Sequence, residues 1–197
     1  MGTDKLSLPL SGMALGNHAL LAALHAGVEH VWIVTGDPGA NWLDGALFGD
    51  GFKGKWTLIH CPDACAGQGH SLRRGVKAAL SAGAGAVMIL LADQPQVTAT
   101  MIRELLNRYG QELERSEIHF AAAEFGGLAR PPVICHARMY SDLLRLQGDR
   151  GARQLIREGR PGIRIPFGQP DLFLDVDTAE DYKSLREKVK AESPPKS

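Results

Sequence analysis

A regular alternation of short apolar runs with longer amphipathic stretches constrains this chain more than any other feature. Residues 30–35 and 86–92 are continuous apolar or β-branched runs, which are typical of strands buried on both faces of a sheet. Stretches with helical spacing separate such runs, as in sheets whose parallel strands are joined by helices. The pattern predicts an α/β fold in which a mostly parallel, mixed sheet lies between helices on both faces.

The ends of the expected elements follow from residue propensities and helix caps. Helices are expected at 15–28, which Gly27 ends, at 41–48, at 71–82, at 99–110 after a Thr98 cap, at 137–146, at 151–158, and at 179–191 after a Thr178 cap. Strands are expected at 30–35, 56–60, 86–92, 118–123, 133–135, 163–166 and 172–176, with Arg130-Pro131-Pro132 as an interruption. Because ligands of α/β sheets bind beyond the carboxyl ends of the strands, the residues directly after each strand are the candidate site.

Length, charge and cysteine content limit the classes of protein. A chain of 197 residues fits one domain, which we expect over residues 1–191, followed by a disordered tail at 192–197. The 22 Lys and Arg balance the 22 Asp and Glu, which argues against a nucleic-acid binder. No apolar run approaches the roughly 20 residues of a membrane span, and the N-terminus lacks the apolar core of a secretory signal. Three cysteines without zinc-finger spacing indicate reduced thiols, so we expect a cytoplasmic protein without membrane contact.

An acidic residue follows the most apolar of the expected strands, in the segment Ala92-Asp93-Gln94-Pro95. A carboxylate at the tip of such a strand lies where a metal ion bound to phosphates would be held. Mg²⁺ suits this position because it takes few protein carboxylates and completes its shell with phosphate and water. Asp93 could equally cap the turn that precedes the helix at Thr98.

A second pair of carboxylates, Asp175 and Asp177, lies at the end of another expected strand. Strand alternation would place both on one face, where a cation or a hydrogen-bond donor must separate the two charges. Either could be a second metal ligand while the other bonds a backbone amide or an arginine. Alternatively, Asp177 or Thr178 only caps the last helix.

Two further segments are candidates for binding anions. Residues 67–72, Gly67-Gln-Gly-His-Ser-Leu72, open a helix, where glycines permit close backbone approach and free N–H groups favour an anion or the edge of a base. Residues 148–153, Gly148-Asp-Arg-Gly-Ala-Arg153, place two guanidinium groups in one connection, and arginine binds phosphate with paired hydrogen bonds. A salt bridge between Asp149 and an arginine of the same loop would explain this segment equally well.

Taken in order, these segments resemble the MobA-like nucleotidyltransferases, and among them the branch of molybdenum-cofactor cytidylyltransferases that accompany xanthine dehydrogenase. The resemblance runs from Met1 to about Leu185. The segment around Lys5 resembles the end of the family signature LAAGxSxRMGxxK. Five further blocks match in the same order along the chain: Thr35-Gly36, Cys61-Pro62-Asp63 with residues 67–72, residues 92–95, residues 148–153 and residues 175–181. Arg130-Pro131-Pro132 departs from the family, which usually has a Gly-His-Pro segment there.

The resemblance implies a three-layer, Rossmann-like nucleotide-diphospho-sugar-transferase fold and a reaction. The reaction is transfer of a nucleoside monophosphate from CTP, or from GTP, to molybdopterin, with release of pyrophosphate. Mg²⁺ would be the cofactor, held by Asp93 and Asp177, and Lys5 and Asp93 would be catalytic. Nucleotide binding would fall to Gly2, Lys5, Gly36, Pro62, Gly67, Ser71, Leu72 and Asp93, and acceptor binding to Gly127, Arg130, Asp149, Arg150 and Arg153. The partner would be a molybdenum hydroxylase such as xanthine dehydrogenase. Two alternatives remain. The enzyme could transfer the nucleotide to another acceptor, such as a sugar phosphate, or the protein could be a catalytically silent chaperone that binds the cofactor.

The same resemblance implies an apolar strand that runs into a glycine-rich loop ahead of Lys5. The printed chain starts inside that loop, so we expect the first strand to be missing and the domain to be incomplete at its N-terminus. Losing a central strand would expose the backbone edges of its two neighbours. Another segment or a dimer partner could instead fill the gap.

Overall fold

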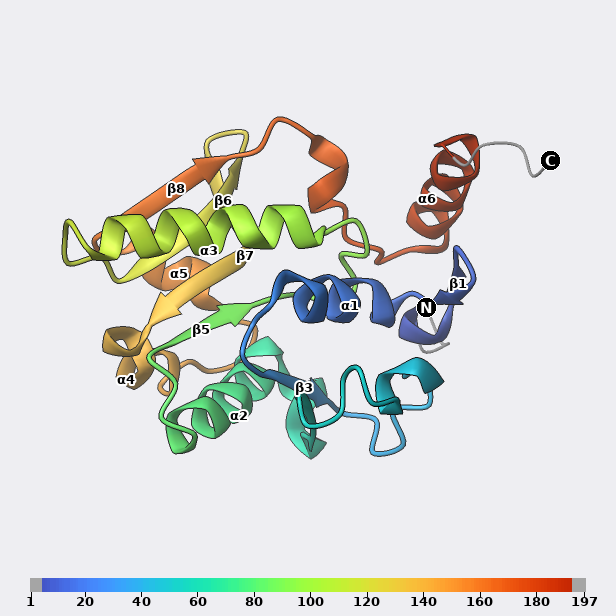
Figure 1. Ribbon diagram of the computed structural model, residues 1–197, viewed down its shortest axis with the longest axis horizontal. Coiled ribbons are helices and arrows are strands. Elements are labelled where there is room, and N and C mark those ends of the chain that lie inside the picture. Colours follow the sequence, from blue (N-terminus) through green and yellow to red (C-terminus); the bar gives the residue numbers. More distant parts are fainter. Residues whose placement is uncertain (1–4, 193–197) are drawn as a thin grey trace.

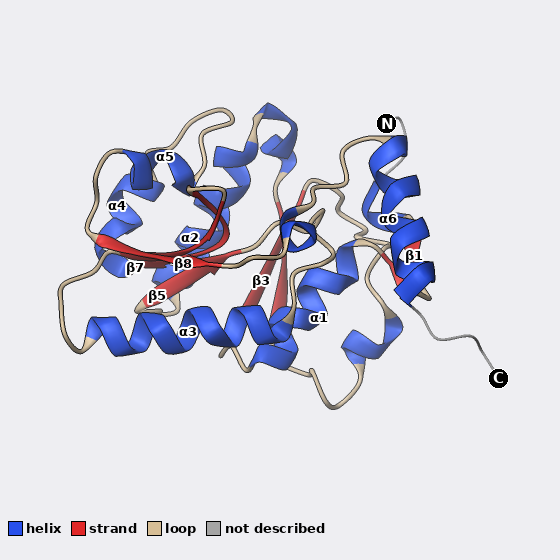
Figure 2. Cartoon of the chain, turned by 90° about the horizontal axis from the view of Figure 1, so that it is seen from above, coloured by secondary structure: helices blue, strands red, loops and turns tan. Residues whose placement is uncertain are grey.

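The computed structural model describes residues 5–192, and it has three layers (Figure 1). Viewed from above, α1 (Gly16–Ala26) and α3 (Ala99–Leu113) cover one face of the strands, while α2 (Gln68–Ser81), α4 (Tyr140–Leu143) and α5 (Ala152–Arg157) cover the other (Figure 2). This arrangement confirms the expected α/β fold. The predicted role of Gly2 lies outside the described residues, and so does the predicted tail, except that residue 192 belongs to the last helix, Ala179–Glu192.

Apart from a short hairpin, the strands of residues 5–192 form two sheets rather than one. β3 (Val31–Thr35) pairs in parallel with β4 (Trp56–His60). The second sheet has the order β5 (Ala86–Ile89), β7 (Leu128–His136), β6 (Phe120–Phe125), β8 (Gly162–Pro166). Only β7 runs against its neighbours there, because β6 and β8 are parallel and β7 is antiparallel to both β5 and β6. A short hairpin, β1 (Pro9–Leu10) with β2 (Met13–Ala14), lies apart from both sheets.

Successive side chains of β6 pack into the apolar clusters on opposite faces of the sheet. Ala121 and Ala123 belong to the apolar cluster under α1 and α3, whereas Phe120 and Ala122 belong to the cluster under α4 and α5. Successive residues of a strand point to opposite faces, so one strand serves both cores. All four side chains are at least 97% buried, so water is excluded from both faces of β6 at these residues.

Helix ends match the sequence expectations where a local cap decides them. α1 stops at Gly27, which has φ of 84°, a conformation that glycine adopts at little cost. The Thr98 hydroxyl accepts a hydrogen bond from the Met101 amide at 3.1 Å and so starts α3. The final helix, α6 (Ala179–Glu192), begins directly after Thr178 as expected.

Two expectations about strands are wrong. Residues 172–176 do not form a strand, because Pro170 opens a 3-10 helix, Pro170–Phe173, and the chain beyond it is irregular. Residues 130–132 do not interrupt the sheet, since β7 continues through them. The pairing with β6 shifts register between Ala122 and Ala123, opposite the two prolines, which cannot donate to the ladder.

Several other elements differ in length. The helix expected at 41–48 is a 3-10 turn, Gly45–Phe48, because the Asp44 side chain caps it at the Ala46 amide. The helix expected at 137–146 is a 3-10 turn, Ala137–Met139, followed by the short α4. α2 begins at Gln68, three residues before the expected start. Within residues 5–192, no helix is both long enough and apolar enough to cross a bilayer.

Candidate active site

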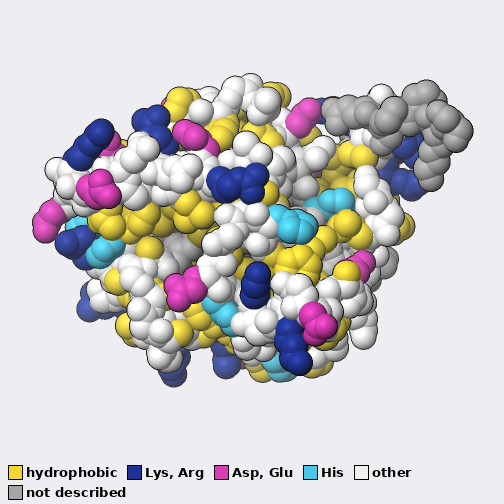
Figure 3. Space-filling view, in the orientation of Figure 1, with side chains coloured by type: hydrophobic (Ala, Val, Ile, Leu, Met, Phe, Trp, Pro, Cys, Tyr) yellow, Lys and Arg dark blue, Asp and Glu magenta, His cyan; other side chains and the backbone are white. Residues whose placement is uncertain are grey.

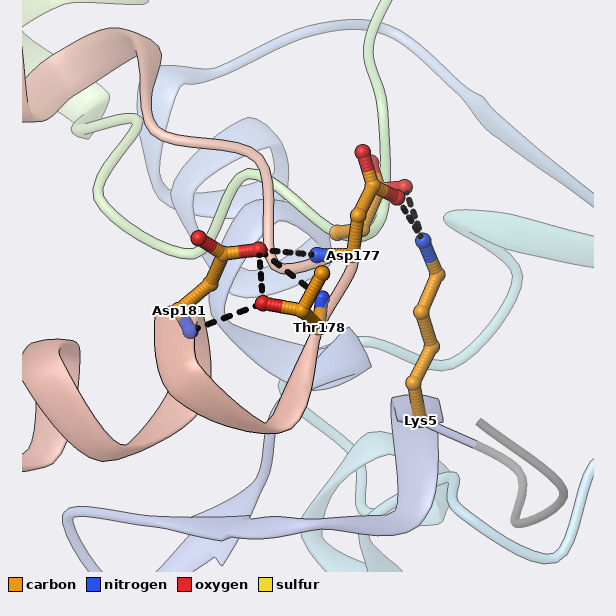
Figure 4. Close-up of polar contacts among 5 residues, drawn as sticks. Lys5, Asp177, Thr178 and Asp181 are labelled. Atoms are coloured by element: carbon orange, nitrogen blue, oxygen red, sulfur yellow. Dashed lines mark hydrogen bonds and ion pairs between the residues drawn. The ribbon is translucent and has the colours of Figure 1, made fainter.

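One lysine and two aspartates from distant parts of the chain meet at the carboxyl end of β5. The Lys5 ammonium donates to Oδ2 of Asp93 at 2.6 Å and to Oδ1 of Asp177 at 2.8 Å (Figure 4). Lys5 lies in the 3-10 turn Lys5–Ser7, Asp93 follows β5, and Asp177 precedes α6. We call these three residues the Lys5 cluster.

The start of α6 explains why Asp177 is available to Lys5. Oδ2 of Asp181 accepts hydrogen bonds from the amide of Asp177 at 3.2 Å and from the amide and hydroxyl of Thr178, each at 2.8 Å. The Asp181 amide in turn donates to the Thr178 hydroxyl at 3.1 Å, which completes a reciprocal cap. Hydrogen bonds from Thr178 hold the pKa of Asp181 below its usual value. Thr178 and Asp181 therefore cap the helix, and the Asp177 carboxylate remains free to bind a cation.

A backbone hydrogen bond brings the two aspartates together. The Val176 amide donates to the Asp93 carbonyl at 3.0 Å, so the residue before Asp177 is tied to Asp93. Val176 is itself buried in an apolar cluster with Leu10, Leu15 and Leu185, which fixes α6 against the N-terminal segment. The Asp93 side chain is 23% exposed and the Asp177 side chain 67% exposed, so the site opens toward solvent on the Asp177 side.

The charges of the Lys5 cluster favour a bound cation. Burial by itself would lower the pKa of Lys5, but hydrogen bonds to Asp177 and Asp93 and the charges of both carboxylates outweigh burial and raise it. Among residues 5–192, no group of three or more His, Cys, Asp or Glu side chains could hold a metal ion. The donor set is thus two carboxylates aimed at one cation, which fits Mg²⁺ that obtains its remaining ligands from phosphate and water.

Asp175 lies beside the Lys5 cluster in a different environment. Burial is the main reason that the pKa of its carboxyl is raised, and the charges of Asp93 and Asp177 raise it further. A hydrogen bond from Gln94 and the charge of Arg153 lower this pKa but do not outweigh burial. Its Oδ1 is buried without a hydrogen-bond partner among the described residues. The premise that a strand places Asp175 and Asp177 on one face is wrong, since residues 172–176 are not a strand.

Gln94 is a site residue to which sequence reasoning assigned no role. It is 2% exposed, its amide bonds Asp175, and its Oε1 has no partner among the described residues. The signal was present, because Gln94 directly follows Asp93 in the segment already singled out.

Gly36 and Pro62, which were predicted to bind nucleotide, lie near each other after two paired strands. The Cys61 amide donates to the Thr35 carbonyl at 2.8 Å, which extends the pairing of β3 and β4 by one bond. Pro62 then opens an exposed 3-10 turn, Pro62–Ala66. A Cβ on Gly36 would lie 3.1 Å from the Cβ of Ala64, so glycine permits this close approach.

The two glycine-containing segments of the sequence pack against each other. A Cβ on Gly67 would lie 2.4 Å from the Gly148 carbonyl carbon, and the Gly69 amide donates to the Gly148 oxygen at 2.8 Å. The amide of Gly69, expected to be free for an anion, is therefore used within the protein. Ser71 and Leu72 follow in the first turns of α2 and line a cavity of about 1020 Å³ between β3 and β5.

The predicted acceptor residues divide into two groups. Asp149, Arg150 and Arg153 are exposed, and the described residues show no ion pair of Asp149 with either arginine, contrary to the alternative of a loop salt bridge. Gly127 and Arg130 belong to the β6–β7 hairpin, and no hydrogen bond among the described residues links them to the Lys5 cluster. Gly126 and Gly127 form its two-residue turn with φ of 61° and 75°.

The fold and the Lys5 cluster define an α/β protein in which two carboxylates converge on one ammonium group beyond the carboxyl end of β5. Sequence comparison supplies the family: the MobA-like NTP transferase domain matches residues 1–163, and the chain belongs to this family. It is also similar to the purine catabolism protein PucB of Bacillus subtilis (strain 168), with 34% identity over 190 residues, 94% of this chain and 89% of that protein. The predicted resemblance to MobA-like nucleotidyltransferases is confirmed.

Solved structures show the same fold. A nucleotidyl transferase from Methanothermobacter superposes with a TM-score of 0.75 at 20% identity, covering 97% of this chain and 87% of that one. The Rv0371c homologue from Mycobacterium sp. strain JC1 gives a TM-score of 0.72 at 26% identity, covering 98% and 91%. Rv0371c of Mycobacterium tuberculosis H37Rv, solved in complex with manganese, gives 0.70 at 22% identity, covering 94% and 93%. The three-layer nucleotide-diphospho-sugar-transferase fold is confirmed.

Proposed function

We propose that this protein is a Mg²⁺-dependent nucleotidyltransferase that moves CMP from CTP to molybdopterin and releases pyrophosphate. The observation that carries the proposal is the convergence of Asp93 and Asp177 on the Lys5 ammonium at 2.6 and 2.8 Å. Two carboxylates already arranged around one cation, in a nucleotidyltransferase family, form a site for a divalent ion bound to a triphosphate. GTP as the donor is the alternative within the same chemistry.

The reaction asks the protein for positioning and charge compensation rather than for a nucleophile. A phosphate oxygen of the acceptor forms a bond to the α-phosphorus of CTP, the bond between that phosphorus and the bridging oxygen breaks, and pyrophosphate carries away the electron pair. Both reactants are anions, so bringing them together in line requires positive charge. A divalent ion held by Asp93 and Asp177 supplies part of that charge when bound.

Lys5 supplies further positive charge in this proposal. The two carboxylates raise the pKa of its ammonium and so favour the charged form, and its side chain is 30% exposed at the mouth of the site. Once a metal ion occupies the carboxylate pair, the ammonium is free to bind phosphate oxygens instead. Lys5 thereby stabilises charge on the triphosphate and on the leaving pyrophosphate.

In this proposal the remaining predicted residues would contact the two substrates. Gly36, Pro62, Gly67, Ser71 and Leu72 would contact the nucleotide from the ends of β3 and β4 and the start of α2. Arg150 and Arg153 are exposed and would bind the acceptor phosphate, with Asp149, Gly127 and Arg130 as further acceptor contacts.

The name of the Bacillus subtilis relative, a purine catabolism protein, supports a partner of matching chemistry. We propose that the product serves a molybdenum hydroxylase such as xanthine dehydrogenase, which oxidises purines. The three free cysteines accord with a reducing compartment, so the proposal places the protein in the cytoplasm, without nucleic acid or membrane as a partner.

Pyrophosphate release tests the proposal. The purified protein is incubated with Mg²⁺, molybdopterin and each nucleoside triphosphate in turn, and release is expected with CTP. Asp93→Asn should abolish release with little change in the melting temperature of the ligand-free protein. Asp177→Asn should reduce release less, because the Asp177 side chain lies on the open, 67% exposed side of the site, where water can replace the lost carboxylate oxygen. Asp171→Asn is the matched control. Asp171 forms an ion pair with Lys188, with 2.6 Å between Oδ1 and Nζ, and neither residue belongs to the Lys5 cluster.

Two results would contradict the proposal. Near-normal turnover of Asp93→Asn at limiting Mg²⁺ would remove Asp93 from the mechanism. No pyrophosphate release with any nucleotide and acceptor, alongside retained molybdopterin binding, would show a cofactor chaperone instead.

A further inference from the structure

The start of α2 holds the connection between α4 and α5 in place. The Gly69 amide donates to the Gly148 carbonyl at 2.8 Å, and Nη1 of Arg73 donates to the Leu146 carbonyl at 2.9 Å. Both donors lie in the first two turns of α2, and both acceptors lie between α4 and α5. We call residues 146–151 the α4–α5 loop.

Close backbone packing joins the same two segments. A Cβ on Gly69 would lie 2.9 Å from the Gly148 oxygen and 3.2 Å from the Arg150 oxygen. Gln68, the first residue of α2, reaches the far end of the loop, where a Cβ on Gly151 would lie 2.8 Å from its Oε1. Because both contacts of Gly69 are with backbone, a side chain there would push the loop away from α2.

Arg73 is the only side chain of α2 whose hydrogen bond to this loop the described residues show. Leu146 is buried, so a donor from the protein takes the place of water at its carbonyl. Nη2 of the same guanidinium lies 3.1 Å from Nδ1 of His70. Since a guanidinium only donates, Nδ1 accepts this bond. The two bonds fix the orientation of the guanidinium between the first turn of α2 and the loop.

The α4–α5 loop leads directly into α5, which carries Arg153. Ala152 of α5, Leu146 of the loop and Val76 of α2 belong to one apolar cluster, so the three segments pack together. Arg150 and Arg153 are exposed and form no ion pair among the described residues. The backbone that carries both guanidinium groups is thus held by contacts with α2.

The distribution of charge makes the placement of these two arginines important. The 22 Lys and Arg of the chain are balanced by 22 Asp and Glu. On the face shown in Figure 3, Lys and Arg side chains lie scattered among acidic and apolar ones and form no single basic patch. Without a broad positive potential, an anionic ligand depends on individual guanidinium groups at hydrogen-bonding distance.

We propose that Arg73 is a positioning residue for the acceptor. By holding the α4–α5 loop on α2, it places Arg150 and Arg153 where they bind the acceptor phosphate. Arg73 touches neither substrate itself and acts through the loop backbone. This inference rests on the transferase function proposed above and adds a residue to it.

Amide hydrogen exchange without any substrate tests the link between α2 and the loop. Arg73→Met keeps the apolar part of the side chain and removes its donors, so exchange of the Gly69 amide should speed up about tenfold. Arg103→Met is the matched control. Arg103 donates to the His25 carbonyl at 3.0 Å, but it lies in α3, which covers the opposite face of the strands from α2. In this control, exchange of the Gly69 amide should not change.

Binding and kinetics test the positioning role. The Kd of molybdopterin, followed by pterin fluorescence, should rise about 10-fold in Arg73→Met. The acceptor KM in pyrophosphate release should rise equally, while kcat and the KM for CTP stay within about twofold of wild type. Arg73→Lys keeps a charged donor and should recover part of the affinity. Arg103→Met should match wild type in all four quantities.

Three outcomes would overturn the inference. Unchanged molybdopterin affinity in Arg73→Met would show that the loop does not depend on Arg73 for acceptor binding. A fall in kcat and melting temperature at unchanged molybdopterin Kd would show a structural role only. Weaker binding without faster exchange of the Gly69 amide would make Arg73 a direct acceptor contact.

Failure of the proposed function would give a different pattern. The wild-type protein would then release no pyrophosphate with any nucleotide. Faster Gly69 exchange and weaker molybdopterin binding in Arg73→Met would still support the positioning role in such a protein, because neither measurement requires transfer.

Discussion

Lys5→Met should tighten the binding of a divalent ion in the absence of nucleotide. In the structure the Lys5 ammonium holds both carboxylates at 2.6 and 2.8 Å, so a metal ion must displace it. Partly exposed ion pairs contribute about 0.5–1 kcal/mol each, and two of them about 1–2 kcal/mol. Removing that competition should therefore raise Mn²⁺ affinity about 5- to 30-fold. Methionine retains most of the apolar length of the lysine side chain, so packing around it is preserved.

The assay is titration of Mn²⁺ followed by the electron paramagnetic resonance signal of the free ion. Lys188→Met is the matched control, because Lys188 also pairs with an aspartate at 2.6 Å but outside the site. A second titration with CTP present should reverse the order, with Lys5→Met binding the nucleotide and metal together more weakly than wild type. Equal Mn²⁺ affinity of Lys5→Met, Lys188→Met and wild type would refute the competition between ammonium and metal.

Three further predictions follow from packing and burial. Gly67→Ala should lower the melting temperature in calorimetry more than Gly54→Ala does. Both glycines have positive φ, but only at Gly67 would the new Cβ lie 2.4 Å from backbone, that of Gly148. Equal effects would contradict the close packing of Gly67 against Gly148. Burial raises the pKa of Cys135 and of Tyr109 to about 12, so the unfolded chain releases these protons from about pH 9 to 10 while the native protein keeps them. The urea concentration at the midpoint of unfolding should therefore fall as the pH rises from about 9 toward 12. A midpoint that stays unchanged between about pH 8.5 and 11 would contradict the raised pKa values of these two groups. With Ellman's reagent at pH 8, the exposed Cys65 should react rapidly and the buried Cys135 only after unfolding. Rapid reaction of Cys135 in the folded protein would contradict its burial.

Local signals in the sequence were sufficient for most elements. Gly27, Thr98 and Thr178 each set a helix end through a bond or a backbone conformation within a few residues, so position in the chain is enough to predict them. The Gly126-Gly127 pair between two apolar runs was an equally local signal for the β6–β7 hairpin, and it was missed. Asp93 was singled out because it directly follows an apolar strand.

Which aspartate joins the site depended on contacts that no local pattern contains. Asp177 reaches Lys5 because Asp181 caps α6 and because Val176 is tied to Asp93, whereas Asp175 turns to Gln94. The strand wrongly expected at 172–176 came from apolar residues that pack without strand pairing, Leu172 and Phe173 in one cluster and Val176 in another. Burial by tertiary contact and burial within a sheet both select apolar residues, so a short apolar run does not distinguish them.

The sequence by itself determined the alternation of strands and helices, the helix caps and the candidate metal ligand at the end of β5. All of these depend on interactions between residues close together in the chain. Only the tertiary structure decided that Lys5 meets Asp177 across 172 residues, that the Gly69 amide is bonded to Gly148, and that the sheet is divided by an apolar cavity. Such contacts depend on how the layers pack and on which backbone edges find partners, and neither is encoded in the spacing of nearby residues.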